Sequence, residues 1–396
     1  MGNKNKNKDK QEKILKVEEK FSDYDLLYEK KTKRCITSFE ILRNNKIMLT
    51  CKGGIIIIYE FIKIQGKKNK EKFELKELLN IDAEEYCFNY GIELKNGDLA
   101  ICSEDSTINI IKLLLDIGDI KKIKNKNNNN NHKYKIKQKI KLGNEPLYII
   151  KEFTNLELVL GSWEFILIFI KVKNLDIYEL ISKIHIEDRT FSLIELNPGE
   201  ILSSQCYSKQ LSIHKMHDIK SIVIKDIESN ENPNIICKYN NQNDIIFVAF
   251  DKGINIVSII KQCVIQKYQT EEIISSICPF ISNLNSKTKI FTLLCSTKKR
   301  VFGKNVNFSY NLLKIIFRTK GKNNSEIIFD GNINNQKNNI TRYRMKEKES
   351  IHYYDIKQIE NLFFCNNNIL DIKKEGQIII SIGCEDKSLK FGKLKN

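Results

Sequence analysis

One local pattern recurs along the chain and constrains its fold more than any other feature of the sequence. In LAICSEDSTINIIKL, Leu99–Leu113, a polar turn separates two apolar runs, and the second run begins with alternation. Two β-branched runs around a tight polar turn are typical of a β-hairpin. The pattern occurs seven times and therefore predicts a repeat protein built from hairpins. The other six copies are Ile47–Phe61, Leu158–Val172, Ile201–Met216, Ile245–Ile260, Phe291–Lys304 and Ile378–Leu394.

Each hairpin has flanking segments that extend it to a predicted four-stranded unit. A further apolar run and a turn precede most hairpins, as in NYGIEL-KNG-DLAI, and Asn-Gly turns between apolar runs are strong hairpin signals. Between units, segments such as HKYKIKQKIKL alternate Lys or Glu with Ile, Val or Tyr, which suits an outer strand with one wet face. Most intervals exceed the ~40–45 residues of a propeller repeat, and the two longest contain insertions rich in Asn and Lys.

The turns of these hairpins carry a family resemblance. Two stretches, CSEDSTINIIK and GCEDKSLKFGK, resemble the GSxDGTIxIWD core of WD40 repeats, with Asp105 and Asp386 at the turn Asp. Asp251 and Glu164 match the same position in other units. The chain departs from the family pattern because it lacks the Trp-Asp pair and the Gly-His dipeptide, and its one tryptophan, Trp163, lies in a turn.

The resemblance implies an all-β fold, a single seven-bladed β-propeller, with eight blades as the alternative. The predicted organisation is a basic flexible tail over residues 1–12 and a propeller over 13–396, with inserted loops at about 117–131 and 303–357. No outer strand follows the last predicted hairpin. We therefore expect Lys13–Phe21 to supply that strand and close the ring, as in WD40-like rings, with a short amphipathic helix as the alternative.

The positive charge of the chain is concentrated in one insertion. The net charge is +17, which favours acidic partners such as acidic proteins, RNA or anionic lipid. The segment Asp119–Lys141 is rich in Lys and Asn and includes a candidate basic patch. A solvated loop that reflects the Lys and Asn bias of the whole chain is the alternative. The lysines of the patch are Lys121, Lys122, Lys124, Lys126, Lys133 and Lys135.

The sequence offers no catalytic, cofactor-binding or metal-binding pattern. It contains no GxSxG, no GxGxxG and no phosphate loop. His214 and His217 are three residues apart, and on a strand such residues point to opposite faces. The most membrane-like run, Leu158–Ile170, is too short to span a membrane and contains Glu164.

The 11 cysteines have no C-x-x-C spacing, and the chain begins without an apolar signal segment. Both observations favour a reducing, cytoplasmic location, with nuclear or cytoskeletal association left open. The sequence thus predicts a non-enzymatic protein–protein interaction scaffold, a subunit or adaptor of an intracellular complex. The alternative is a propeller that binds nucleic acid or an anionic membrane, including phosphoinositides, through its basic insertion.

Overall fold

The computed structural model describes strands and short connections over most of the chain. The described residues are 24–43, 46–65, 71–82, 87–114, 133–172, 174–186, 188–205, 208–216, 221–224, 233–238, 245–250, 253–269, 273–285, 288–301, 307–319, 354–365, 369–375, 378–383 and 388–394. The strands are β1 Tyr24–Lys31, β2 Ile36–Leu42, β3 Lys46–Cys51, β4 Ile55–Gln65, β5 Glu71–Asp82, β6 Phe88–Glu93, β7 Leu99–Ser103, β8 Thr107–Leu113, β9 Tyr134–Lys141, β10 Ile149–Glu152, β11 Leu158–Gly161, β12 Phe165–Val172, β13 Ile177–His185, β14 Thr190–Glu195, β15 Glu200–Gln205, β16 Gln210–Lys215, β17 Ser221–Ile224, β18 Pro233–Lys238, β19 Ile245–Phe250, β20 Gly253–Ser258, β21 Cys263–Gln269, β22 Ile273–Asn285, β23 Thr288–Val301, β24 Asn307–Thr319, β25 Tyr354–Cys365, β26 Ile369–Glu375, β27 Ile378–Gly383 and β28 Ser388–Leu394.

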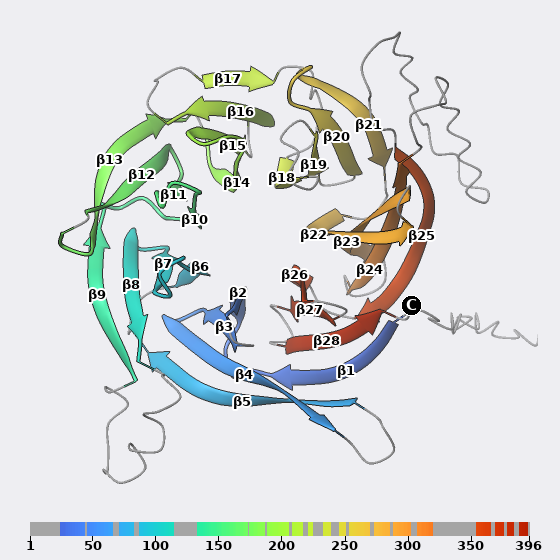
Figure 1. Cartoon of the computed structure of the whole chain (residues 1–396), viewed down its shortest axis with the longest axis horizontal. Helices are drawn as coiled ribbons and strands as arrows, with labels where there is room; N and C mark the ends of the chain where they lie inside the picture. The colour runs from blue at the N-terminus through green and yellow to red at the C-terminus, as the bar shows by residue number, and fades with distance from the viewer. Residues whose placement is uncertain are drawn as a thin grey trace, which may run out of the picture.

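These strands form seven four-stranded antiparallel sheets that are arranged as the blades of a ring (Figure 1). Six sheets use four consecutive strands in chain order, such as β6-β7-β8-β9, with the first strand near the centre and the fourth on the outside. Within the described ranges all regular structure is strand, so the predicted all-β propeller is confirmed. The eight-blade alternative stays a prediction, because residues 320–353 lie outside those ranges.

Both ends of the described chain meet in the seventh sheet, which has the order β1-β28-β27-β26. The pairing of β1 with β28 runs from Tyr24 opposite Leu394 to Lys31 opposite Ser388. The sequence prediction placed this outer strand at Lys13–Phe21, which lies outside the described residues, whereas the strand in that position is β1. The segment YDLLYEKK mixes Leu and Tyr with charged residues, as an outer strand requires, so composition alone did not separate the two candidates.

In six of the seven predicted hairpins both strands are present and pair as expected, but the copy at Phe291–Lys304 was misplaced. Its predicted turn lies inside β23, which pairs with β24 as far as Val301 opposite Asn307. Strand β22 pairs with β23 only as far as Ile273 opposite Lys298, so β23 and β24 continue beyond the end of β22. Polar residues are expected in a two-stranded extension, because no further strand covers it. The predicted insertion at 303–357 is likewise corrected, since it contains β24 and the first residues of β25.

Neighbouring sheets pack face to face, and this packing makes the middle strands apolar on both sides. All residues of β7 and β19 are buried, although an antiparallel sheet with one wet face would show alternation. One cluster joins Ala100 and Ile108 of one sheet to Leu158, Leu167 and Phe169 of the next. Burial of such side chains contributes about 25 cal/mol for each Å² of apolar surface removed from water.

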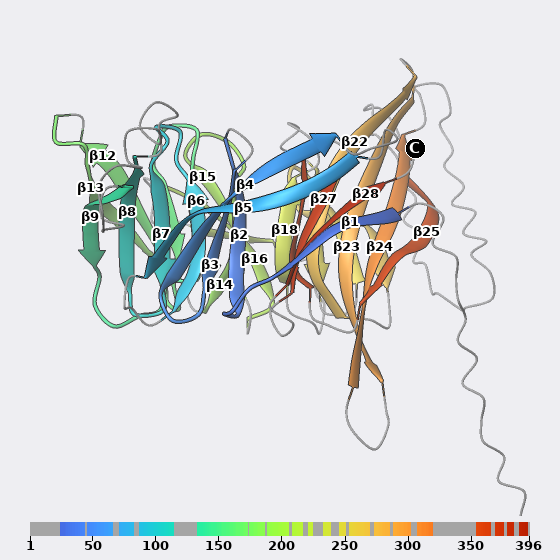
Figure 2. The same ribbon diagram turned by 90° about the horizontal axis from the view of Figure 1, so that it is seen from below.

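The hairpin β4–β5 extends past its own sheet and lies over the seam of the ring (Figure 2). Strand β3 pairs with β4 only as far as Lys46 opposite Glu60, and beyond that point β4 pairs with β5 alone. Strand β5 contacts β1, and Leu75 of β5 belongs to a buried cluster that includes Leu389 of β28. The first and seventh sheets, which are neighbours in the ring, are therefore held together by apolar side chains of β5 and β28.

The described part of the chain contains no helix long and apolar enough to cross a membrane. Six of its cysteines carry free thiols, and burial raises the pKa of the Cys51 and Cys102 thiols to about 12. These two thiols are neutral and act as small apolar core residues. Cys35 is disulfide-bonded.

Candidate functional site

The short turn between β11 and β12 carries Trp163, the single tryptophan of the chain. Ser162 closes this turn, because its backbone N–H donates to the carbonyl oxygen of Phe165 at 2.9 Å and its Oγ accepts the N–H of Phe165 at 3.0 Å. The Trp163 residue is 40% exposed. A large aromatic side chain is thus held at the surface by a turn with little freedom to rearrange.

The chain that leads from β13 to β14, and so from this sheet to the next, is hydrogen-bonded to the same turn. The N–H of Ile186 donates to the carbonyl of Glu164 at 2.8 Å, and the N–H of Thr190 donates to the carbonyl of Ser162 at 3.2 Å. The two residues that flank Trp163 therefore both accept hydrogen bonds from the segment that carries Asp188 and Arg189. This pairing fixes the position of that segment relative to Trp163.

The guanidinium of Arg189 packs against two aromatic rings. Its Cζ is 3.8 Å from the centroid of the Tyr148 ring and 4.4 Å from that of the Phe191 ring. Tyr148 in turn lies beside Trp163, with centroids 6.5 Å apart and planes tilted by 49°. Cation–π contacts of this kind contribute about 0.5–2 kcal/mol each, depending on their exposure. We refer to Tyr148, Trp163, Arg189 and Phe191 as the arginine–aromatic cluster.

The donors of Arg189 are not used within the described structure. No hydrogen bond or ion pair joins its guanidinium to any described residue, and its Nε is buried. The adjacent carboxylate of Asp188 is directed elsewhere, because it accepts the backbone N–H groups of Arg189 and Ser208, both at 2.6 Å. The cluster therefore holds a fixed cation whose hydrogen-bonding edge has no protein acceptor among these residues.

Gly161 permits the close approach that assembles the cluster. A Cβ at this position would lie 2.9 Å from Cγ2 of Ile149 and 2.9 Å from Cβ of Thr190, so no other residue fits without displacement. The carbonyl of Gly161 also accepts the N–H of Tyr148 at 2.9 Å. One small residue thus lets the strand that begins at Thr190 lie against β11, with Tyr148 and Arg189 on adjacent sheets.

The four turn residues taken from the resemblance have different positions. Glu164 lies beside Trp163 and is exposed, and no described residue donates a hydrogen bond to its carboxylate. Asp105 lies between β7 and β8, where its carboxylate accepts the N–H of Thr107 at 3.1 Å and the hydroxyl of Thr107 at 2.9 Å. Asp251 and Asp386 fall outside the described residues.

The environment of Asp105 stabilises its charged form. Burial opposes ionisation, but hydrogen bonds from Thr107 and Ser103 and the nearby charge of Lys141 outweigh that effect and lower the pKa of Asp105. Lys141 reaches this turn from the outer strand β9, with its Nζ 3.4 Å from the carboxylate. Asp105 therefore fixes a turn and its neighbouring strand.

Only two lysines of the candidate basic patch lie in the described chain. Lys133 precedes β9, and its Nζ donates to the carbonyl of Leu78 at 3.4 Å. Lys135 is exposed on β9, at the end of the sheet opposite the turn of Asp105. The remaining four, Lys121, Lys122, Lys124 and Lys126, lie outside the described ranges. The structure does not bring Lys133 or Lys135 to the arginine–aromatic cluster.

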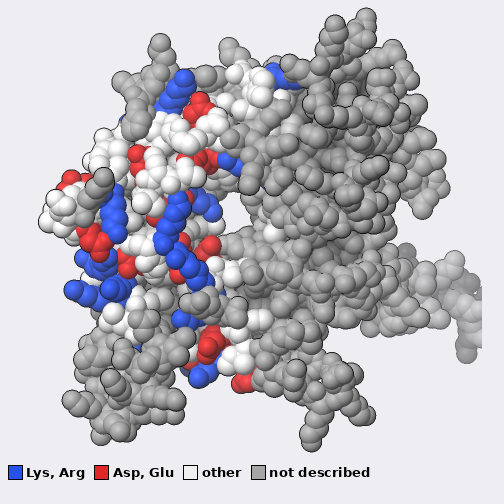
Figure 3. Space-filling view, viewed as in Figure 1, with Lys and Arg blue, Asp and Glu red and all other residues white. Residues whose placement is uncertain are grey.

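A recurrent carboxylate, missed by the sequence analysis, joins neighbouring sheets near the ends of their inner strands. Glu93 accepts the backbone N–H of Arg43 at 2.7 Å, and Glu152 accepts that of Lys95 at 2.6 Å. Glu195 accepts the N–H of Thr154 at 2.8 Å in the same way. The sequence Glu-Leu or Glu-Phe, which ends the inner strand in each of these three units, was the available signal. On the face viewed in Figure 3, Lys and Arg side chains lie beside Asp and Glu along the left side of the central opening.

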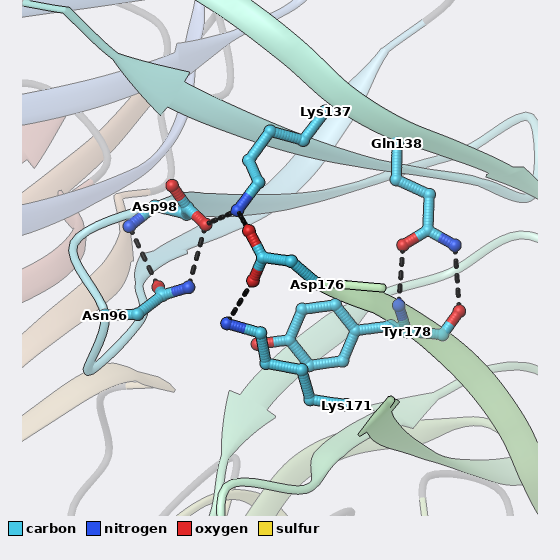
Figure 4. Close-up of polar contacts among 7 residues, drawn as sticks. All are labelled: Asn96, Asp98, Lys137, Gln138, Lys171, Asp176 and Tyr178. Carbon is cyan, nitrogen blue, oxygen red and sulfur yellow. Dashed lines mark hydrogen bonds and ion pairs between the residues drawn. The ribbon is translucent and has the colours of Figure 1, made fainter. Parts of the chain in front are cut away.

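An ion-pair network joins the second and third sheets on their outer side (Figure 4). Lys137 of β9 lies between two carboxylates, with its Nζ 2.7 Å from Asp98 and also bonded to Asp176. Asp176 binds Lys171 as well, and Asn96 donates to Asp98 at 2.8 Å. Hydrogen bonds from Lys137 and Lys171 lower the pKa of Asp176 to about 2. Because these charges pair with one another, the network is structural.

Two hydrogen bonds complete this contact between the outer strands. The side-chain amide of Gln138 donates to the carbonyl of Tyr178 at 2.8 Å and accepts its N–H at 2.7 Å (Figure 4). Gln138 therefore provides the donor and the acceptor that a neighbouring strand would offer to the backbone of Tyr178 in β13.

His214, considered as half of a metal pair, is buried in β16 and 1% exposed. Its Nε2 lies 2.8 Å from the hydroxyl of Ser203, and burial lowers its pKa to about 4. His217 is outside the described residues, and no group of three or more His, Cys, Asp or Glu side chains within them could hold a metal ion.

No protein-family model matches the sequence, and no curated protein matches it. Solved structures match the fold over most of the chain. A chain of the mitotic checkpoint complex has a TM-score of 0.56 at 10% identity, covering 94% of this chain and 95% of that chain. The WD40 β-propeller domain of Doa1 has a TM-score of 0.57 at 10% identity, covering 94% and 98%. The β-propeller domain of Cps50 (Swd1) from Myceliophteria thermophila has 0.56 at 7% identity, covering 94% and 100%.

These likenesses agree with the ring of four-stranded sheets and with the turn sequences around Asp105. The chain therefore has the WD40 β-propeller fold, as the resemblance in its sequence implied.

Proposed function

We propose that the protein is a non-enzymatic protein-interaction scaffold, a subunit or adaptor of a cytoplasmic complex, and that it binds a partner through the arginine–aromatic cluster. The observation that carries this proposal is the exposed Trp163 beside Tyr148, whose ring and that of Phe191 both contact the guanidinium of Arg189. Trp, Tyr and Arg dominate the energetic centres of protein interfaces, because they combine large contact area with directed polar groups.

Rigidity is the second argument for this surface. Both carbonyls next to Trp163 are bonded to the connection that carries Arg189. A partner that binds here would lose little free energy to ordering the surface, because the contact residues are already fixed. The likeness to a chain of the mitotic checkpoint complex, itself an assembly, is consistent with a role in a complex.

The proposal is tested by affinity purification of tagged full-length protein from its native cells, with identification of the co-purifying proteins. We expect Trp163→Ala to lose the partners of the wild-type protein. Ile181→Ala is the matched control, because Ile181 is 43% exposed but lies on the outer strand β13. If Trp163→Ala retains every partner while its thermal unfolding matches that of the wild type, the cluster is not the binding surface.

The alternative role, binding of RNA or an anionic membrane through the basic insertion, stays a prediction. Lys133 already contacts a backbone carbonyl of the neighbouring sheet, which gives it a structural use.

A further inference from the structure

We infer that the arginine–aromatic cluster binds an acidic segment of a partner protein, with a carboxylate of that segment on the guanidinium of Arg189. This inference rests on the proposed function and specifies its partner. The guanidinium carbon of Arg189 lies over the Tyr148 and Phe191 rings, 3.8 and 4.4 Å from their centroids. A guanidinium that packs on aromatic rings keeps its N–H groups for hydrogen bonds, and two parallel N–H groups match a carboxylate.

Among the described residues, none serves as a counter-ion for Arg189. Asp188 is the adjacent residue, yet its two oxygens accept backbone N–H groups of Arg189 and Ser208. No described residue forms an ion pair with the half-buried guanidinium of Arg189. A partly buried cation without an acceptor is unfavourable, so an incoming carboxylate would gain both the charge pair and the unmade hydrogen bonds.

The surroundings favour a segment with apolar as well as acidic side chains. Trp163 presents an exposed ring next to Tyr148. Phe165, two residues after Trp163, contacts the ring of His185, with centroids 5.4 Å apart, and its ring centroid lies 5.6 Å from the Nζ of Lys183. A partner could place an apolar side chain on Trp163 and a carboxylate on Arg189. The net charge of +17 would also attract an acidic segment.

The same surroundings disfavour a polyanion such as RNA. Glu164 is exposed in the turn of Trp163, and Glu145 accepts a hydrogen bond from Ser162 at 3.3 Å. A chain of phosphates would meet these carboxylates at close range, whereas one carboxylate requires only the single guanidinium.

The test is a selection from a random peptide library displayed on phage, with immobilised full-length protein as the target. We expect the enriched peptides to contain Asp or Glu close to an apolar residue. Replacing that acidic residue by its amide should weaken binding about tenfold or more, the range expected for loss of charge-assisted hydrogen bonds. Arg189→Gln should weaken binding by a similar factor.

Three variants separate the guanidinium from general charge effects. Lys183→Gln removes one nearby positive charge and should bind the peptides almost as the wild type does. Glu164→Gln should retain or strengthen binding, because it removes a repulsive carboxylate. Arg189→Lys keeps a cation without the planar fork, so it should reduce the preference for the acidic peptide over its amide form. If Arg189→Gln does not unfold cooperatively, and so is not properly folded, the comparison with Arg189→Lys still tests the role of the guanidinium.

The outcomes distinguish this inference from the proposed function. If the enriched peptides contain no carboxylate but lose binding to Trp163→Ala, the surface is an interaction site and the acidic partner is wrong. If the peptides bind Trp163→Ala and Arg189→Gln as they bind the wild type, both proposals fail. A selection that enriches no peptide, or RNA that binds the wild type and loses affinity in Arg189→Gln, also overturns the acidic-segment inference.

Discussion

The guanidinium carbon of Arg189 lies 3.8 Å from the centre of the Tyr148 ring, although the two residues precede the inner strands of different sheets. This contact depends on how closely β14 approaches β11. Gly161 of β11 sets that approach, because its missing side chain leaves room for Thr190. The geometry of the cluster is therefore a property of the packing between sheets rather than of any single loop.

Gly161→Ala should disturb the cluster and the packing together. The added methyl group would lie 2.9 Å from atoms of Ile149 and Thr190, so the two sheets must move apart locally. We expect a loss of about 1–3 kcal/mol in the free energy of unfolding, as for other overpacked sites, measured by denaturant titration. Because Trp163 is the single tryptophan, its fluorescence reports directly on the cluster.

Gly97→Ala is the control for this experiment. Gly97 has a φ of +88° and nothing within 4 Å of an added Cβ, so alanine there strains the backbone without pushing two sheets apart. We expect it to lower stability while leaving the Trp163 emission spectrum of the folded protein unchanged. An unchanged spectrum in Gly161→Ala would contradict the role assigned to Gly161.

Asp105→Ala should destabilise the protein by roughly 1–2 kcal/mol and spare binding at the cluster. The change leaves the N–H and hydroxyl of Thr107 without their acceptor. The folded-state pKa of Asp105 lies below its ordinary value of 3.8. Its contribution is thus present above about pH 3.8 and is lost as the pH falls through the lower, folded-state pKa.

Urea titrations of wild type and variant at several pH values measure this contribution. Glu164→Ala is the comparison, because no described residue bonds to its carboxylate, and its stability should match that of the wild type. Loss of partner binding in Asp105→Ala at unchanged stability would show that the residue belongs to an interface instead.

Local signals explain why the sheets were predictable and the cluster was not. A turn such as Lys95-Asn96-Gly97 between apolar runs specifies a hairpin from adjacent residues, so the strands of most units followed from the sequence. The turn misplaced within β23 shows the limit of this reasoning, since a polar run marks either a turn or a strand that extends past the core. Tyr148 and Arg189 are far apart in sequence and meet only through packing between sheets. The one available hint was the single tryptophan in a turn, two residues after a glycine.

The stability of the protein should fall below pH 6.5 partly because of His214. Burial lowers its pKa from 6.5 to about 4. Between these values the unfolded chain binds a proton that the folded chain does not, so stability decreases as the pH falls from 6.5 to about 4 and changes no further below that. The effect is on the order of 3 kcal/mol. It is measured by denaturant titration across that range.

His214→Gln removes the titration but can still bond to the hydroxyl of Ser203, now 2.8 Å from Nε2. We expect its stability to depend less on pH between 4 and 6.5 than that of the wild type. His185→Gln is the control for the substitution itself, because His185 is exposed on β13 rather than buried. Equal slopes in all three proteins would show that His214 titrates normally.

Closure of the ring should depend on β1 and not on the residues before it. Deleting residues 1–31 removes β1 and exposes the edge of β28, which favours pairing with other chains. It also removes a neighbour of β5 at the seam where Leu75 packs with Leu389. We expect aggregation and loss of a cooperative thermal transition, observed by light scattering and calorimetry. Deletion of residues 1–21 leaves β1 in place and should melt as the full chain does. If the shorter deletion also aggregates, the segment Lys13–Phe21 has a role in closure after all.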